Sequence, residues 1–147
     1  MIFLGGDDDH EALAFSLHVA QHPNVRLTVV WIRVEMQHKQ RSMKNPYINL
    51  MEHVKYNPNL TGKVAFKEEV VEDGIGTTHV IRTMDGHFSL VIVGRHHIEN
   101  SQCILGLTEW CELPELGPLG NLLASDFTFS VLVVQHRSFN FTFGCNT

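Results

Sequence analysis

Apolar runs rich in valine and isoleucine mark the chain at residues 1–4, 27–32, 90–93 and 131–134, and a weaker run covers residues 64–71. Each run is nearly continuous, rather than alternating between apolar and polar positions. Continuous apolar strands are typical of a parallel sheet with helices on both faces. The pattern therefore predicts buried parallel strands.

The segments between these runs carry signals for helices. The first opens with three consecutive acidic residues, which suit the positive end of a helix dipole, and Asp8 and Glu11 have the spacing of a capping box. Pro23 is expected to end that helix. A second helix is predicted with Asp73 as its N-cap, and a third begins near Pro118.

This succession of strands and helices indicates an α/β fold with a doubly wound parallel sheet. Residues 36–63 are mostly polar and show no regular pattern of apolar positions. We expect them to form a mobile connection that holds a short helix near residues 47–56.

Composition and charge narrow the possible functions. The 147 residues suffice for one domain, and 44% hydrophobic with 18% charged residues is ordinary globular composition. A net charge of −5 without a long basic cluster makes nucleic acid and anionic membranes poor partners. No signal peptide is visible, and the apolar runs are too short to insert into a bilayer. The three cysteines lack C-x-x-C spacing and are expected to be reduced thiols.

The stretch LVIVGRHH, residues 90–97, places candidate binding chemistry where a strand ends. In open α/β sheets, ligands bind beyond the carboxyl ends of the strands. Glycine lets backbone N–H groups approach a phosphate closely, and Arg95 has the charge to pair with it. The alternative is a buried strand that ends in glycine because the chain must turn. Neither G-x-G-x-x-G nor a Walker loop is present.

Metal binding and catalysis have less support. Adjacent His96 and His97 tend to point apart, while His18 and His22 share a helix face but have no further ligand. The acidic triplet has the chemistry for Mg²⁺, although the helix dipole explains it more simply. Acids flank Cys111, which disfavours a reactive thiolate, and no nucleophile elbow occurs. We therefore expect no metal site and no enzymatic activity.

Four segments together resemble the C-terminal cytosolic region of the plant cation/proton exchangers, the monovalent cation:proton antiporters. They are IFLGGDDDHEALAFSLHVAQHPNVRLTVV, VVEDGIGTTHVIRTM, FSLVIVGRHH and GLTEWCELPELGPLGNLLASDFTFSVLVVQ. The most specific feature is the pattern GL-x-x-W-x-E-x-PELG-x-x-G-x-LLAS-DF. The resemblance covers residues 2–135 apart from the polar middle, and it implies a universal stress protein-like fold with a five-stranded parallel sheet in the order 3-2-1-4-5.

The resemblance also implies a role. Residues 1–135 would form a non-catalytic regulatory domain, followed by a Phe-containing tail at residues 136–147. In the family, two stress-protein-like halves follow a membrane antiporter domain, and this chain resembles the second half. The implied partners are the transmembrane domain and the first half, on the cytoplasmic side of the plasma membrane or an endomembrane. The implied function is regulation of potassium or sodium/proton exchange through pH, a ligand or partner binding; the alternative is a nucleotide-binding module.

ATP-binding universal stress proteins carry an acid at the end of the first strand and, after the fourth, G-x-x-G, nine residues, then G-Ser/Thr. Here glycine takes the position of the acid, His97 stands at the second glycine, and the last glycine is followed by Pro118. The phosphate cradle is therefore expected to be degraded, and no cofactor is expected. Any ligand would lie against the residues of this crevice, namely Gly5, Gly6, Gly94, Arg95, His96 and Gly117.

Two further expectations concern this crevice. Ten histidines in an antiporter-linked domain suggest coupling to protonation, and His96 and His97 beside Arg95 are the candidate pH sensors. Residues 109–120 are expected to fold back over the strand ends, anchored by Trp110.

The last apolar strand would lie at a sheet edge in the implied order. It carries no charge, proline or bulge to protect that edge, which predicts a two-fold homodimer. The alternative is that the tail covers the edge, since Phe139, Phe141 and Phe143 alternate along it. The expected dimer interface consists of Val131, Leu132, Val133 and Val134.

Overall fold

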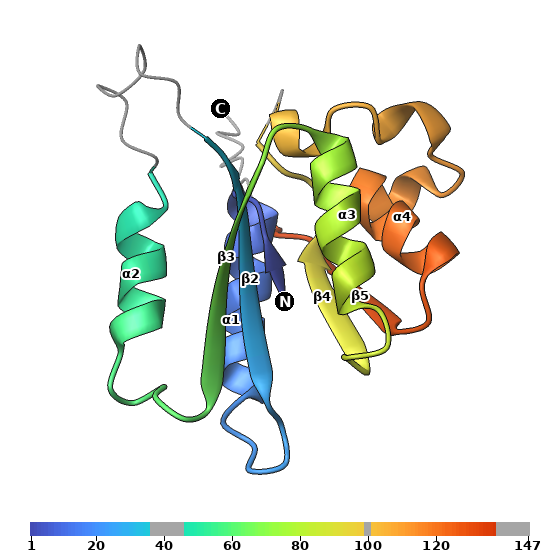
Figure 1. Cartoon of the computed structure of the whole chain (residues 1–147). Helices are drawn as coiled ribbons and strands as arrows, with labels where there is room; N and C mark the ends of the chain where they lie inside the picture. Colours follow the sequence, from blue (N-terminus) through green and yellow to red (C-terminus); the bar gives the residue numbers. More distant parts are fainter. Residues whose placement is uncertain (36–45, 99–100, 138–147) are drawn as a thin grey trace, which may run out of the picture.

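A computed structural model describes residues 1–35, 46–98 and 101–137, except for the side chain of Trp110. Strands and helices alternate along the described chain, as the apolar pattern predicts (Figure 1). They are β1 (Ile2–Phe3), α1 (Asp7–Val19), β2 (Leu27–Val34), α2 (Ile48–Tyr56), β3 (Val64–Val71), α3 (Gly74–Met84), β4 (Leu90–Gly94), α4 (Gly117–Asp126) and β5 (Ser130–Val134). The 3-10 helices η2 (Gln102–Ile104), η3 (Thr108–Trp110) and η4 (Pro114–Leu116) precede α4.

The strands form two parallel sheets, one in the order β1-β2-β3 and one of β4 with β5. The α/β class and the parallel pairing are confirmed, but the prediction of one continuous five-stranded sheet is wrong. The physical reason lies in β1, which has only two residues. Just beyond it, Gly5 and Gly6 adopt φ angles of 120° and 113° and turn the chain into α1 before a ladder with β4 forms.

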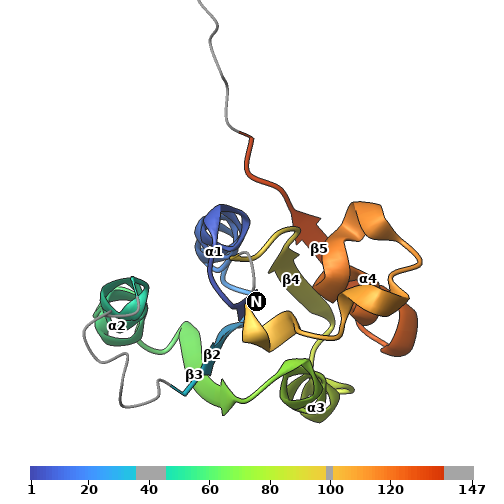
Figure 2. The ribbon, with the colours of Figure 1, turned by 90° about the horizontal axis from the view of Figure 1, so that it is seen from above.

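Helices cover both faces of the strands. Seen from above, α1 and α2 lie on one side and α3 and α4 on the other (Figure 2). Successive residues of a strand serve opposite layers: in β2, Val30 and Ile32 pack with α3 and α4, whereas Val29 and Trp31 pack with α1 and α2. This explains the continuous apolar runs, because residues 29–32 of the central strand β2 are all buried.

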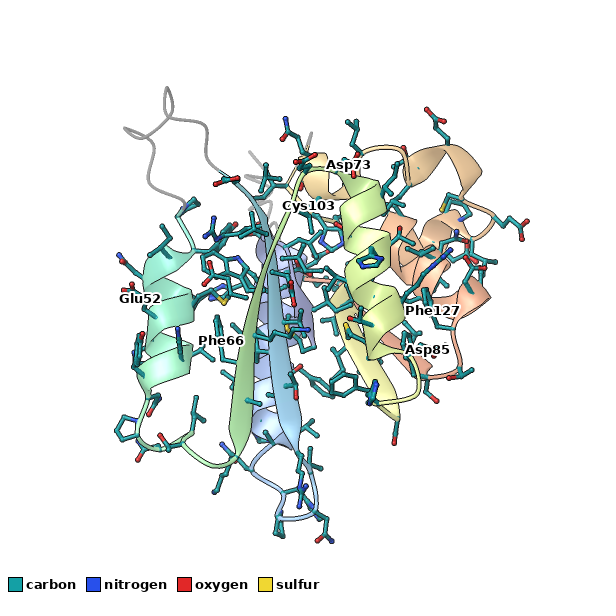
Figure 3. The ribbon with its side chains drawn as sticks, in the orientation of Figure 1. Glu52, Phe66, Asp73, Asp85, Cys103 and Phe127 are labelled. Carbon is teal, nitrogen blue, oxygen red and sulfur yellow. The ribbon has the colours of Figure 1, made fainter. Side chains whose placement is uncertain are left out.

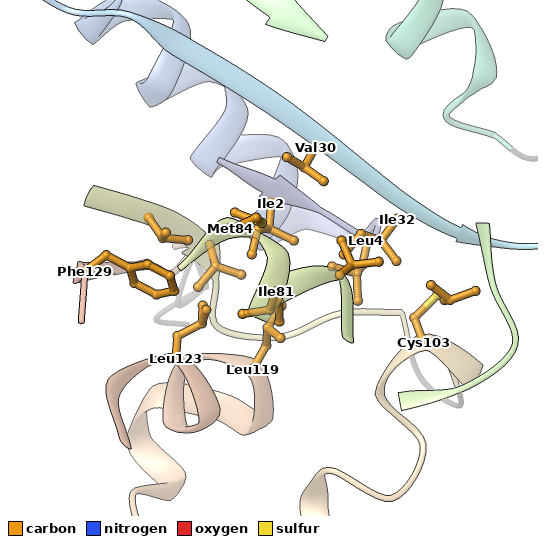
Figure 4. Packing of buried hydrophobic residues seen from close by; sticks show 14 residues of the cluster. Ile2, Leu4, Val30, Ile32, Ile81, Met84, Cys103, Leu119, Leu123 and Phe129 are labelled. Carbon is orange, nitrogen blue, oxygen red and sulfur yellow. The ribbon is translucent and has the colours of Figure 1, made fainter. Parts of the chain in front are cut away.

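The layer under α3 and α4 is the larger of two apolar clusters (Figure 4). Ile81 from α3 and Leu119 and Leu123 from α4 are fully enclosed against the strands. Cys103 from η2 closes one end of this layer. Burial raises the pKa of its thiol, so Cys103 behaves as a core residue and not as a nucleophile.

Helix ends test the predicted caps. Asp73 caps α3 as predicted, accepting the N–H of Gly76 at 3.0 Å, and Pro118 stands in the first turn of α4. The predicted capping box of α1 is wrong, because Gly6 is the N-cap and no side chain caps the helix. Asp8 is instead turned toward the strand ends.

The polar middle contains α2, which confirms the predicted short helix. Met51 and Val54 are buried against the sheet, and Phe66 of β3 packs in the same layer (Figure 3). The predicted mobility of this connection stays a prediction, and residues 36–45 lie outside the described residues. So do the tail phenylalanines and the Trp110 side chain. In the described part of the chain, no helix combines the length and the apolar character needed to cross a membrane.

Candidate functional site

The carboxyl ends of β1, β4 and β5 meet at one edge of the molecule, together with the amino end of α1. The turn at Gly5 and Gly6 starts α1 at this edge, so the acidic first turn of the helix comes against the end of β4. An acidic first turn is favourable at the positive end of a helix dipole. Here two of its carboxylates, those of Asp8 and Asp9, also accept hydrogen bonds from backbone N–H groups near the ends of the strands.

Asp9 is completely buried and accepts hydrogen bonds from three separate segments. Its Oδ2 accepts the N–H groups of Leu4 at 2.8 Å and of Gly5 at 3.0 Å, just after β1. Its Oδ1 accepts the N–H of Gly94, the last residue of β4, at 2.9 Å. The Nδ1 of His97 lies 3.0 Å from Oδ2. The carboxylate therefore joins the ends of β1 and β4, where no backbone ladder runs.

Asp8 makes a second set of contacts, toward β5. Its Oδ2 accepts the N–H of His96 at 2.9 Å and lies 3.0 Å from the Nδ1 of the same residue, and its Oδ1 accepts the N–H of His136 at 2.8 Å. Burial alone would raise the pKa of Asp8, but the hydrogen bonds from His136 and His96 outweigh it, so the pKa lies below its ordinary value. Asp8 is therefore an ionised acceptor at neutral pH.

The two candidate pH sensors have different surroundings. The side chain of His96 is 63% exposed, whereas that of His97 is fully buried. An ionised carboxylate only accepts, so the contact with Asp9 is a hydrogen bond in the tautomer of His97 that carries its proton at Nδ1. The Nε2 of His97 is buried without a hydrogen-bond partner among the described residues. The geometry thus distinguishes His97 as the enclosed member of the pair.

The structure brings the predicted ligand-binding residues together, but most of their donors already have acceptors. The N–H groups of Gly5, Gly94 and His96 point to the acids of α1, and the N–H of Gly6 donates to the hydroxyl of Tyr47 at 2.9 Å. An incoming phosphate would have to compete with these groups.

The two remaining predicted residues line the same crevice on the side of α4. The Nη1 of Arg95 donates to the Oε1 of Gln135 at 3.1 Å. Gly117 lies so close to the end of β4 that an added Cβ would be 2.0 Å from the carbonyl oxygen of Arg95. The start of α4 therefore packs directly on the strand end, which leaves no gap at this point for a ligand.

Sequence reasoning missed the role of Asp8 and Asp9, which it assigned to the helix dipole or to Mg²⁺. A signal was present: two glycines directly before the acids allow a sharp turn, which swings the first helical turn back onto the neighbouring strand. No group of three or more histidine, cysteine or acidic side chains suitable for a metal occurs within the described ranges.

The family described as the C-terminal domain of the plant cation/H(+) antiporters matches residues 1–135. The chain belongs to this family. It is 41% identical to cation/H(+) antiporter 14, 40% identical to cation/H(+) symporter 13 and 40% identical to cation/H(+) antiporter 15, all of Arabidopsis thaliana. These alignments cover 92–93% of this chain but only 17–19% of the relatives. No solved structure matches.

A concave region of this antiporter C-terminal domain lies at the opposite end of the strands. It is an open groove of about 510 Å³ lined by Arg82, Asp85, Asp126 and Phe127, of which Asp85 and Phe127 are labelled in Figure 3. The hydroxyl and N–H of Thr128 donate to Asp85 and lower its pKa. The carboxylate of Asp85 thus holds the turn that leads into β5.

Proposed function

We propose that this chain is a non-catalytic regulatory domain of a monovalent cation (K⁺/Na⁺)/proton antiporter and lies on the cytoplasmic side of the parent membrane. Its relatives are named as cation/H(+) transporters, and the chain spans less than a fifth of their length. Among the described residues, no helix could span a membrane and no group of three or more histidine, cysteine or acidic side chains could hold a metal ion. A folded domain of this kind acts on transport through the conformation of the rest of the protein.

The observation that carries the regulatory proposal is the contact between His97 and Asp9. A histidine titrates near neutral pH, and this one reaches a carboxylate that joins β1 with β4. A second proton would place an N–H at Nε2, where no acceptor lies among the described residues, and would also add a positive charge beside Asp9. Both effects alter the junction of the two sheets. His96, which is exposed and contacts Asp8, is the weaker candidate.

The proposed pH response can be measured in a full-length parent antiporter. Asparagine at position 97 places an N–H donor near the position of Nδ1 but cannot titrate. We expect His97→Asn to keep cation/proton exchange while flattening its dependence on cytoplasmic pH, whereas His96→Asn leaves the pH profile close to that of the wild type. Unchanged profiles in both variants would remove pH from the proposal. Equal transport after deletion of residues 1–135 would remove regulation altogether.

The proposed partners are the remainder of the antiporter and a second copy of this chain. Strand β5 pairs with β4 on one side, and in the described part of the chain no strand covers its other side. Its four apolar residues, Val131, Leu132, Val133 and Val134, are only half-buried. This supports a two-fold homodimer through β5. The order of the elements and the helices on both faces likewise support a universal stress protein-like ancestry.

Nucleotide binding is the alternative function, and the contacts of the crevice argue against it. The acids of α1 already accept the N–H groups that would face a phosphate. Thermal unfolding with ATP, AMP and cyclic nucleotides separates the two proposals. A nucleotide at one hundred times its Kd would stabilise the fold by about 2.7 kcal/mol. An unchanged Tm for all of them would favour the regulatory role without a nucleotide.

A further inference from the structure

Four donors converge on one carboxylate at the junction of β1 and β4. They are the N–H groups of Leu4, Gly5 and Gly94 and the ring of His97. Three of them meet Oδ2 and one meets Oδ1, which together use most of what a carboxylate can accept. We infer that these donors form a binding site for a small planar oxyanion, which the chain fills with its own side chain.

The donors do not belong to the helix that carries Asp9. A carboxylate that merely caps a helix accepts N–H groups from its own first turn. Asp9 instead accepts them from the chain after β1, from the end of β4 and from the segment that follows β4. The site would persist without the carboxylate because the backbone pairing of β1 with β2 and of β4 with β5, and the apolar layer that both sheets share, hold the donors in place.

The shape of the site selects a carboxylate. The side chain of Asp9 has no exposed surface. A Cβ added to Gly94 would lie 2.4 Å from Oδ1, so the wall of the site on this side is bare backbone. Truncating Asp9 to alanine keeps its Cβ and vacates the volume of one carboxylate group. Formate matches that volume and charge, whereas tetrahedral phosphate exceeds it.

In the native chain the internal ligand makes the junction independent of a bound anion. Loss of the carboxylate would leave three backbone N–H groups and a histidine buried without acceptors, which is costly. A small anion that entered would restore those bonds.

Chemical rescue of Asp9→Ala tests this inference. Thermal unfolding would be followed at neutral pH in sodium formate and in sodium chloride of equal ionic strength. We expect Asp9→Ala to unfold well below the wild type in chloride. Formate at ten times its Kd should then raise its Tm by about 3–6 °C. In a ¹⁵N-labelled sample, formate should shift the amide signals of Leu4, Gly5 and Gly94.

Two control variants separate site binding from a general salt effect. Asp9→Asn fills the site but turns an amide donor toward the N–H groups, so it should be destabilised and gain nothing from formate. Asp7→Ala removes an exposed acid from the same helical turn and should respond like the wild type. Equal stabilisation of all variants by formate would overturn the inference, and so would a folded Asp9→Ala that does not respond.

Asp9→Ala has a second readout if it does not fold in chloride. Recovery of its circular dichroism spectrum in formate, but not in chloride, would then support the site. Failure to fold in either salt, with Asp9→Asn folded, would count against it, because the donors would not be held in place without the side chain.

Discussion

Replacing Gly117 with alanine tests how closely the start of α4 is held against the end of β4. Gly117 has a φ of 73°, and an added Cβ would lie 2.0 Å from the carbonyl oxygen of Arg95. With a ψ of 169°, this backbone lies in a region essentially restricted to glycine, which costs alanine about 1–3 kcal/mol. Crowding against a backbone atom adds about 1–3 kcal/mol, because neither segment can yield without moving its neighbours. We therefore expect a loss of about 2–6 kcal/mol in the free energy of unfolding.

Gly106→Ala is the matched control for this substitution. Gly106 has a φ of 87°, but nothing lies within 4 Å of an added Cβ. It should lose only the backbone term of about 1–2 kcal/mol. Urea unfolding followed by circular dichroism measures both variants, and their difference contains the crowding together with the extra backbone cost at Gly117. If the two losses agree within about 0.5 kcal/mol, the close approach of α4 to β4 is refuted.

Three further predictions address the acids, the edge and a helix cap. The folded state depresses the pKa of Asp8 below its ordinary 3.8, so its stabilising effect is present above that pH and lost as pH falls through the folded value; the urea midpoints of wild type and Asp8→Asn should differ near pH 6 and converge in acid. Sedimentation should show a wild-type dimer at tens of micromolar protein and a Val133→Lys monomer; a wild-type monomer, or a dimer unaffected by Val133→Lys, would contradict the edge model. Asp73→Ala should lose about 1 kcal/mol of stability, and hydrogen exchange at Gly76 should quicken; unchanged exchange would contradict the cap.

The strands were predictable because burial on both faces leaves a strong mark in the sequence. Each position of β2 from Val29 to Ile32 is enclosed, so the run has no polar member. Helix α3 was equally predictable, since its N-cap and its buried residues can be recognised from residue type and spacing along the chain. The cap depends on residues that are neighbours along the chain, and the buried strands and the inward face of α3 depend on the spacing of apolar residues. Both kinds of information are present in a single sequence.

The acidic turn of α1 could not be interpreted in the same way. Three adjacent acids are compatible with a dipole, a cap or a metal, and the choice depends on where the turn lies in space. Asp9 meets Gly94 across 85 positions of sequence. The break between the sheets was hidden for a related reason: the apolar run at residues 1–4 predicts a strand but not how many of its N–H groups a neighbouring side chain will take.

Between β1 and β4, hydrogen bonds to one side chain take the place of a backbone ladder. This makes the junction sensitive to the charges around that side chain. A backbone ladder spreads its strength over many similar hydrogen bonds, and no single charge controls it. Between β1 and β4, by contrast, the polar contacts of Leu4, Gly5 and Gly94 all end on the one carboxylate of Asp9. Because His97 touches that carboxylate, a change in its protonation acts on every one of these bonds at once. Under the regulatory role proposed above, weakening these bonds would let the two sheets shift relative to each other while both remain intact, the kind of movement that a regulatory domain passes to the protein it belongs to.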